Sequence, residues 1–335
     1  MLYFYSLYTV IIIMINIYFR KKKILSNYTG DHHQLFSNTK NIPLLGGIFL
    51  IIPMILINYE NYIYFLLIVF TSLIGIFSDT KILVSPKKRF LFQLSLILFS
   101  VIFLKLEILS SRIIFFDNFL EEKIFNIFFT SFCMLVLLNG SNFIDGLNGL
   151  LITYMTMVII ILLKLNLISE ILIYEGQIKY LIFFLLILNT LNFCNLLMLG
   201  DTGAYLLSFF VGFLIISCHK ANPYISPYFF ITIIWYPCYE NLFSIIRKLR
   251  SNFSPLNPDN KHLHQLLYLA IKKNFFKNNL LANNVSSLII NIANLAIIYA
   301  GSIKPYSSVY QITLIIISLI IYTTVFTLLK KNKKL

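Results

Sequence analysis

The segment that decides the fold reads IFNIFFTSFCMLVLLNGSNFIDG, residues 124–146. It holds an almost uninterrupted apolar run, which is long enough to cross the hydrocarbon core of a bilayer as a helix. The run then gives way to asparagines, glycines and a single acid, Asp145. A carboxylate at the end of a membrane span is costly, so its presence predicts a functional group.

The same arrangement of an apolar run and an acid occurs twice more. Asp79 ends Gly75-Ile-Phe-Ser-Asp79, and Asp201 lies between two apolar runs in Leu199-Gly-Asp201-Thr-Gly203. Carboxylates suit a hard cation such as Mg²⁺, which also binds water and substrate phosphates. Three acids on one membrane face would therefore form a metal and phosphate site. Taken singly, each acid is equally well explained as a helix cap or a turn residue.

Composition indicates a membrane protein. The chain has 335 residues, of which 59% are hydrophobic, and its mean hydropathy is +0.83. These values predict an all-α, polytopic helical bundle that forms one domain over residues 1–335. The net charge of +14 does not indicate nucleic acid, because topology explains lysines scattered over loops. The four cysteines form no CxxC pair and fit packing or lipid-facing positions.

We expect about eleven transmembrane helices, with the N-terminus outside and the C-terminus inside. Most of the 27 lysines and arginines then lie in inside loops, as the positive-inside rule requires. This orientation rests on basic residues alone, yet it places Asp79, Asp145 and Asp201 on the cytoplasmic side. The expected spans cover about residues 2–19, 44–59, 61–78, 90–107, 124–142, 148–164, 178–197, 204–218, 227–246, 281–301 and 307–329. The expected cytoplasmic loops cover about residues 20–43, 78–89, 143–147, 198–203 and 247–280.

The longest inside loop contains two histidines, His262 and His264. Pro255 and Pro258 precede them and predict a break, followed by a short helix on the membrane surface. Residues at i and i+2 do not share a helix face, so the histidines are a poor zinc pair. They could instead donate hydrogen bonds to a phosphate or carry a proton. The alternative is that they are interfacial residues without a role.

Two further charged positions have open interpretations. The basic run Lys87–Arg89 fits either an anchor on the positive side of the membrane or a contact to a lipid phosphate. Glu240 lies inside an apolar span, and Arg247 follows one or two turns later. We expect Glu240 to be a pairing residue near the interface, with Arg247 as its partner.

Taken together, the motifs resemble those of the polyprenyl-phosphate N-acetylhexosamine-1-phosphate transferases, a family of glycosyltransferase family 4. The nearest branch is that of the initiating undecaprenyl-phosphate GlcNAc-1-phosphate transferases. The resemblance runs from about Asp31 to Leu267. In chain order it rests on Pro43-Leu-Leu-Gly46-Gly47, Ser78-Asp79 with Arg89, Asn142-Phe-Ile-Asp145-Gly, Leu199-Gly-Asp201-Thr-Gly, Tyr236-Pro-Cys-Tyr-Glu240 and His262-Leu-His264.

The resemblance implies a reaction and its partners. N-acetylhexosamine 1-phosphate would pass from a UDP-sugar to undecaprenyl phosphate, UMP would leave, and cell-envelope polysaccharide synthesis would begin. The implied cofactor is Mg²⁺, with Mn²⁺ as the alternative. The implied location is the inner (plasma) membrane, with several passes, surrounding membrane lipid and a cytoplasmic active site. No nucleic acid partner is expected, and a homodimer is one option for the assembly.

The resemblance also assigns roles to residues. Asp201 matches the metal-binding aspartate, and Asp79 and Asp145 match acids at the catalytic centre. The expected substrate-binding residues are Asn142, His262, His264 and Arg89.

The chain departs from the family pattern at several polar positions. Ser78 replaces the first acid of an acidic pair, and Leu44 and Leu196 replace basic residues. Asn148 replaces an acid, and Asn38 lies near the place of an absent histidine. These losses support an alternative, a catalytically divergent or inactive protein of the same fold that binds lipid or nucleotide sugar. A transporter is less favoured, because the acids lie at span ends rather than along a pathway.

Overall fold

In a computed structural model of the chain, the described residues are 2–26, 42–58, 60–169, 175–255 and 261–332. They form helices joined by short connections, with one isolated β-bridge between Ser26 and Pro43. The all-α prediction is therefore confirmed for this part of the chain. Its helices are α1 Leu2–Lys22, α2 Gly46–Ile57, α3 Tyr62–Asp79, α4 Pro86–Phe103, α5 Ile114–Glu121, α6 Lys123–Ile144, α7 Leu150–Lys164, α8 Glu175–Phe193, α9 Gly200–Ala221, α10 Pro227–Ile233, α11 Trp235–Leu249, α12 Leu263–Asn274, α13 Asn279–Ile303 and α14 Ser308–Asn332.

Each predicted span coincides with one helix, or with the pair α10–α11. Within the described residues, however, only six helices are long and apolar enough to cross a membrane, or seven if the bent pair α10–α11 is one span. Two other helices, α2 and α7, are apolar but shorter. The structure thus supports a multi-pass membrane protein, while the count of about eleven spans and the orientation stay predictions.

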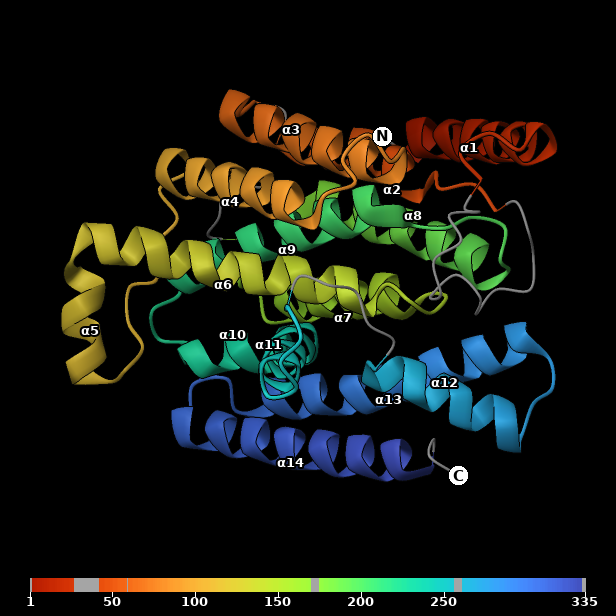
Figure 1. The fold of residues 1–335 in the computed structure, drawn as a ribbon. Coiled ribbons are helices and arrows are strands. Elements are labelled where there is room, and N and C mark those ends of the chain that lie inside the picture. The colour runs from red at the N-terminus through yellow and green to blue at the C-terminus, as the bar shows by residue number, and fades with distance from the viewer. Residues whose placement is uncertain (1, 27–41, 59, 170–174, 256–260, 333–335) are drawn as a thin grey trace.

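Helix α9 is the centre of the bundle. Most of the helices run side by side, with α5 across one end and α12 near the other (Figure 1). Helix α9 packs against α2, α3, α6 and α7, and its residues from Thr202 to Ile216 are all buried. A helix that is apolar on all sides is typical of a protein core or of a membrane span. Asp201 lies in its first turn, so the innermost helix carries one of the three acids.

Glycines allow α2 and α3 to reach the first turn of α9. A Cβ atom on Gly47 would lie 2.2 Å from the nitrogen of Gly203, and one on Gly75 would lie 2.3 Å from the Cα of Thr202. Only glycine permits such a close backbone approach, as at other tight helix contacts in membranes. The two predicted motifs with Gly47 and Asp201 are therefore in direct contact.

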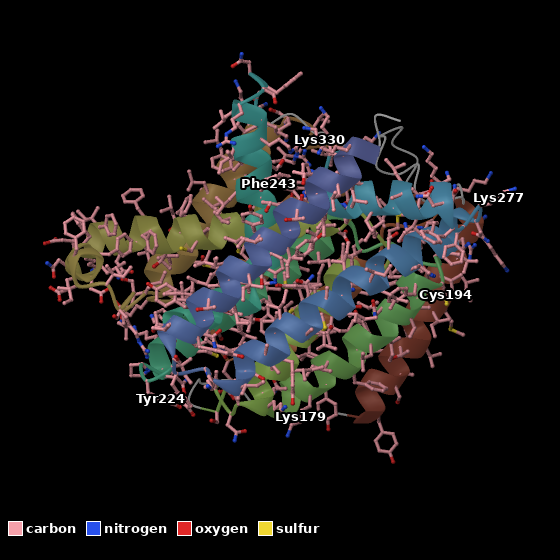
Figure 2. The ribbon with its side chains drawn as sticks, turned by 90° about the horizontal axis from the view of Figure 1, so that it is seen from below. Lys179, Cys194, Tyr224, Phe243, Lys277 and Lys330 are labelled. Carbon is pink, nitrogen blue, oxygen red and sulfur yellow. The ribbon has the colours of Figure 1, made fainter. Side chains whose placement is uncertain are left out.

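The predicted span at 227–246 is broken. Helices α10 and α11 meet at an angle of 79°. Pro237 lacks the N–H group that would bond the carbonyl of Ile233 in a continuous helix, and the hydroxyl of Tyr154 donates to that carbonyl at 3.0 Å. The bend turns α11 out of the direction of α13 and α14, as Figure 2 shows near Phe243. Helix α11 packs on α6, where a Cβ on Gly140 would lie 2.0 Å from the oxygen of Pro237.

Candidate active site

Asp79 ends α3 and caps the N-terminus of α9. Its Oδ1 accepts a hydrogen bond from the backbone N–H of Asp201 at 2.8 Å, and its Oδ2 accepts from the N–H of Thr202 at 3.0 Å. The hydroxyl of Thr202 also donates to Oδ2, at 2.6 Å. The first N–H groups of a helix have no partner within the helix and favour an anion. Asp79 supplies that anion and so holds Asp201 in place.

Asp201 contacts two residues of the motif around Asp79 through one oxygen. Its Oδ2 accepts hydrogen bonds from Ser78 Oγ at 2.5 Å and from Arg89 Nη1 at 3.0 Å, and Arg89 Nη1 also donates to Ser78 Oγ at 2.9 Å. The side chains of Arg89 and Asp201 are 30% and 26% exposed. At that exposure the ion pair adds little to the stability of the fold. Its effect is to hold the guanidinium group of Arg89 beside the acids.

Asp145 lies directly after α6, as its C-cap, and its side chain is half-buried. Burial raises the pKa of Asp145 well above its ordinary value, and the negative charges of Asp201 and Asp79 raise it further. The three acids are thus close enough to repel one another. The structure brings together the acids that the sequence placed on one membrane side. Asn142 lies on the last turn of α6, three residues before Asp145, and is also half-buried.

The histidine motif reaches this site from far along the chain. A Cβ on Gly146 would lie 2.5 Å from Nε2 of His264, so the buried imidazole lies against the backbone beside Asp145. The rings of His262 and His264 stack with their centroids 5.7 Å apart. His264 therefore joins the group of acids, and His262 lies behind it.

Glu240 is a pairing residue, as expected, but its partners differ from the expected one. Its Oε1 lies 2.9 Å from Nδ1 of His262, and its Oε2 accepts a hydrogen bond from the hydroxyl of Tyr322 at 2.8 Å. Arg247, the predicted partner, donates instead to Ser244 at 3.1 Å. Glu240 is on the buried face of α11, and α12 and α14 supply the groups that meet it there.

An asparagine cluster holds the turn after Asp145, and sequence reasoning missed it. The oxygen of Asn283 accepts from the N–H of Asn148 at 2.8 Å, and Asn284 accepts from the Asn148 side chain at 3.2 Å. The oxygen of Asn192 accepts from the N–H of Gly149 at 2.5 Å, where φ is +70°. Asparagines are costly in apolar helices, and this cost was the available signal.

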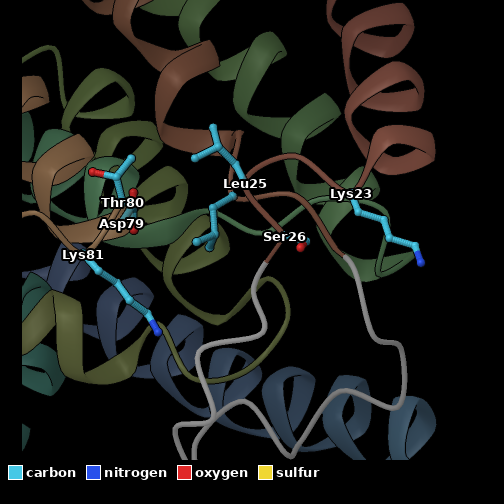
Figure 3. Close-up of a pocket in the computed structure, with 7 residues that line it drawn as sticks. Lys23, Leu25, Ser26, Asp79, Thr80 and Lys81 are labelled. Atoms are coloured by element: carbon cyan, nitrogen blue, oxygen red, sulfur yellow. The ribbon is translucent and has the colours of Figure 1, made fainter.

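A cavity of about 360 Å³ adjoins Asp79. Figure 3 shows Lys81 and Lys23 on opposite sides of it, with Leu25 and Ser26 between them. The cavity thus joins cationic and hydroxyl groups to an apolar wall, to which Leu44 contributes. Leu44 is one of the positions where the family has a basic residue. Among the described residues, the cavity is lined by Lys23, Leu25, Ser26, Leu44, Asp79, Thr80 and Lys81.

Comparison with known proteins identifies the central part of the chain. Residues 61–219 match the model of glycosyl transferase family 4. This segment, slightly less than half of the chain, is therefore similar to that family. The resemblance drawn from the motifs is therefore confirmed, and the segment contains Asp79, Arg89, Asp145 and Asp201. The histidine motif lies after the segment, and Asp31, Asn38 and Asp259 lie outside the described residues.

Three relatives carry the same description, undecaprenyl-phosphate alpha-N-acetylglucosaminyl 1-phosphate transferase. The Escherichia coli K12 protein is 27% identical over 204 residues, which are 57% of this chain and 54% of that protein. The Salmonella typhi protein is 26% identical over 198 residues, with the same shares of 57% and 54%. The Yersinia pestis protein is 25% identical over 147 residues, 42% of this chain and 40% of that protein. The match thus spans about half the length of these relatives.

The donor set is compatible with a family-type Mg²⁺ site. No group of three His, Cys, Asp or Glu side chains that could hold a metal occurs among the described residues. Mg²⁺ does not need such a cage, because it usually binds one or two carboxylates, several waters and substrate phosphates. Within the described part of the chain, the side-chain hydrogen bonds of Asp201 all use its Oδ2, and the mutual repulsion of the three acids is what a divalent cation would relieve. Asp201 as metal ligand stays a prediction.

Proposed function

We propose that the protein transfers N-acetylhexosamine 1-phosphate from a UDP-sugar to undecaprenyl phosphate, with release of UMP, at the cytoplasmic face of a plasma membrane. The observation that carries this proposal is the gathering of Asp79, Asp145 and Asp201 around the first turn of α9, with Arg89 bonded to Asp201. The match to glycosyl transferase family 4 and the activity for which the relatives are named support it.

The reaction needs two anions to be held in line. An oxygen of the lipid phosphate forms a bond to the β-phosphorus of the UDP-sugar, and the bond from that phosphorus to the oxygen shared with the α-phosphorus breaks. The electron pair leaves with UMP. A phosphate monoester is already ionised near neutral pH, so positioning and charge neutralisation matter more than a strong base. Mg²⁺, when bound, would neutralise diphosphate oxygens.

Different residues of the chain would bind the two substrates. Arg89 and His264 lie beside Asp201 and Asp145 and can donate to diphosphate oxygens of the nucleotide sugar. The cavity beside Asp79 combines lysines with leucines, which fits a phosphate that carries an apolar chain. The second substrate would then approach Asp79 from this cavity.

The test is release of UMP by purified protein with undecaprenyl phosphate, Mg²⁺ and a panel of UDP-N-acetylhexosamines. We expect turnover with at least one sugar, its loss on chelation of the metal, and its loss in Asp201→Asn without a change in the melting temperature. A well-folded protein that turns over none of the sugars would refute the proposal. Wild-type rates in Asp201→Asn would exclude Asp201 as an essential ligand.

A second candidate, a divergent protein that binds the substrates without efficient transfer, is favoured by Ser78. The hydroxyl of Ser78 lies between Arg89 and Asp201, where the family has an acid. If this candidate is right, Ser78→Asp raises a negligible rate, because the added carboxylate restores charge at the site. A robust rate in the unaltered protein argues against it.

A further inference from the structure

The contacts of His262 extend to the last helix, well outside the segment that matches the family. His262 precedes α12, Glu240 lies on α11 and Tyr322 lies on α14. Glu240 bridges the other two, with Oε1 at 2.9 Å from His262 Nδ1 and Oε2 at 2.8 Å from the hydroxyl of Tyr322. The three side chains form a connected series of hydrogen bonds that joins α11, α14 and the residue before α12.

All three groups are removed from solvent. Glu240 and Tyr322 are 1% exposed and His262 is 5% exposed. A buried carboxylate is tolerated only when its oxygens are hydrogen-bonded, and here each oxygen has its own hydrogen-bond partner. The N–H of Leu263 adds a longer bond to Oε1, at 3.4 Å. Loss of the tyrosine hydroxyl would therefore free one oxygen and allow Glu240 to turn away from His262.

Packing fixes the tyrosine hydroxyl in turn. The ring of Tyr322 makes edge contacts with Tyr239 and Phe243 of α11, with centroids 4.9 Å and 5.3 Å apart. On its own helix it stacks with Phe326 at 6.2 Å. Aromatic contacts of this kind restrict the ring to one orientation. The packing of the ring therefore directs its hydroxyl toward Glu240.

We propose that Tyr322 is a positioning residue for His262, and that it acts by fixing the carboxylate of Glu240. This inference rests on the proposed function, in which the histidine motif serves the diphosphate of the nucleotide sugar. A histidine whose Nδ1 faces a carboxylate has a fixed ring orientation, which directs its other nitrogen. Through Tyr322, the orientation of α14 would therefore determine how the histidine motif meets the substrate.

The first test is kinetic. We expect Tyr322→Phe to lower kcat/KM for the UDP-sugar about tenfold, the usual effect of losing a hydrogen bond to a charged group. The matched control is Tyr310→Phe, because Tyr310 is on the same helix and its hydroxyl donates to the carbonyl of Ala300 instead. In a His262→Ala background, Tyr322→Phe should add almost nothing, since residues acting as a unit are not additive.

The second test does not depend on turnover. In protein labelled with ¹⁵N at its histidines, the ring signal of His262 is assigned by its loss in His262→Ala. We expect Tyr322→Phe to shift this signal and Tyr310→Phe to leave it in place. If Tyr322→Phe does not fold, 3-fluorotyrosine at position 322 keeps the ring and alters only the donor strength of the hydroxyl. The same shift is then expected.

The outcomes separate this inference from the proposed function. Absence of UMP release by the wild-type protein would count against the proposed function alone, and the spectra would still decide whether Tyr322 positions His262. An unchanged His262 signal in both the Tyr322→Phe and the fluorotyrosine proteins would overturn the inference. An equal loss of kcat/KM in the wild-type and His262→Ala backgrounds would also overturn it, because it would show a general effect of α14.

Discussion

Both carboxylate oxygens of Asp79 are bonded to the first turn of α9. The resemblance drawn from the sequence motifs implies a role for Asp79 at the catalytic centre. The geometry adds a second role, because the same carboxylate fixes the backbone that carries Asp201. The two roles differ in what they predict for the stability of the protein.

The change Asp79→Asn distinguishes these roles. An amide accepts hydrogen bonds at one atom only, so the substitution should lower the free energy of unfolding by about 1–2 kcal/mol, as for loss of a helix cap. It should also reduce UMP release, because Asp201 is no longer held. Melting temperature and turnover are measured together. Reduced turnover at an unchanged melting temperature would show that Asp79 acts only in the reaction.

Gly200 is the residue that permits this capping contact. Its φ is +74°, and a Cβ there would lie 2.8 Å from Oδ2 of Asp79. We expect Gly200→Ala to destabilise the protein, by about 1–2 kcal/mol for the left-handed backbone alone, and to impair transfer. Gly176→Ala is the control, since no atom of the described residues lies within 4 Å of a Cβ at that position. Equal melting temperatures for the two variants would contradict the capping geometry.

The charged residues of the candidate site could be predicted from the sequence. Asp79, Asp145 and Asp201 were conspicuous because they follow apolar runs, and the orientation inferred from the basic residues placed them on one side. The structure gathers them. Asn192, Asn283 and Tyr322 escaped notice. The cost of an asparagine in an apolar helix signals that it has a partner but not which one, and a tyrosine looks like an ordinary packing residue. The partners here come from distant parts of the chain.

At the scale of elements, the packing of α9 against α2 and α3 depends on glycine. We expect Gly47→Ala to lower both the melting temperature and turnover, because its Cβ would come within 2.2 Å of the Gly203 backbone and force the helices apart. Gly212→Ala on α9 is the control, since its Cβ would meet Leu137 and Met134 at 3.4 Å or more, which is ordinary contact. If Gly212→Ala is as damaging as Gly47→Ala, the close approach of α2 and α9 is not what matters.

The positions of the helices were predictable and their breaks were not. Apolar runs mark where a helix can lie, so each predicted span has a helix at its place. The run at 227–246 conceals the bend between α10 and α11. Pro237 indicated that the helix could break there. Only the structure shows that the hydroxyl of Tyr154 donates to the carbonyl of Ile233, to which Pro237 cannot donate. Helix α5, a segment of eight residues between two spans, is too short to be anticipated from an apolar run.

For the molecule as a whole, contacts in the structure show that the motifs lie together. The side of the membrane on which they lie rests on the distribution of lysine and arginine alone. His264 lies beside Gly146, and Asp79 caps α9, so the motifs meet at one end of the bundle. The segment that matches the family ends at residue 219, yet α11, α12 and α14 complete the surroundings of the histidine motif. The C-terminal third is therefore part of the candidate site and not an appendage to it.

The membrane side of that site can be tested with two cysteines that flank one span. Helix α13 is long and apolar enough to cross the membrane, and the exposed residues Lys277 and Lys304 lie at its two ends. The excess of lysine and arginine near the histidine motif predicts that Lys277 is inside. In a variant without the four native cysteines, Lys304→Cys should react with a membrane-impermeant maleimide in intact cells. Lys277→Cys should react only after permeabilisation, and the reverse pattern would place the site outside, away from cytoplasmic nucleotide sugars.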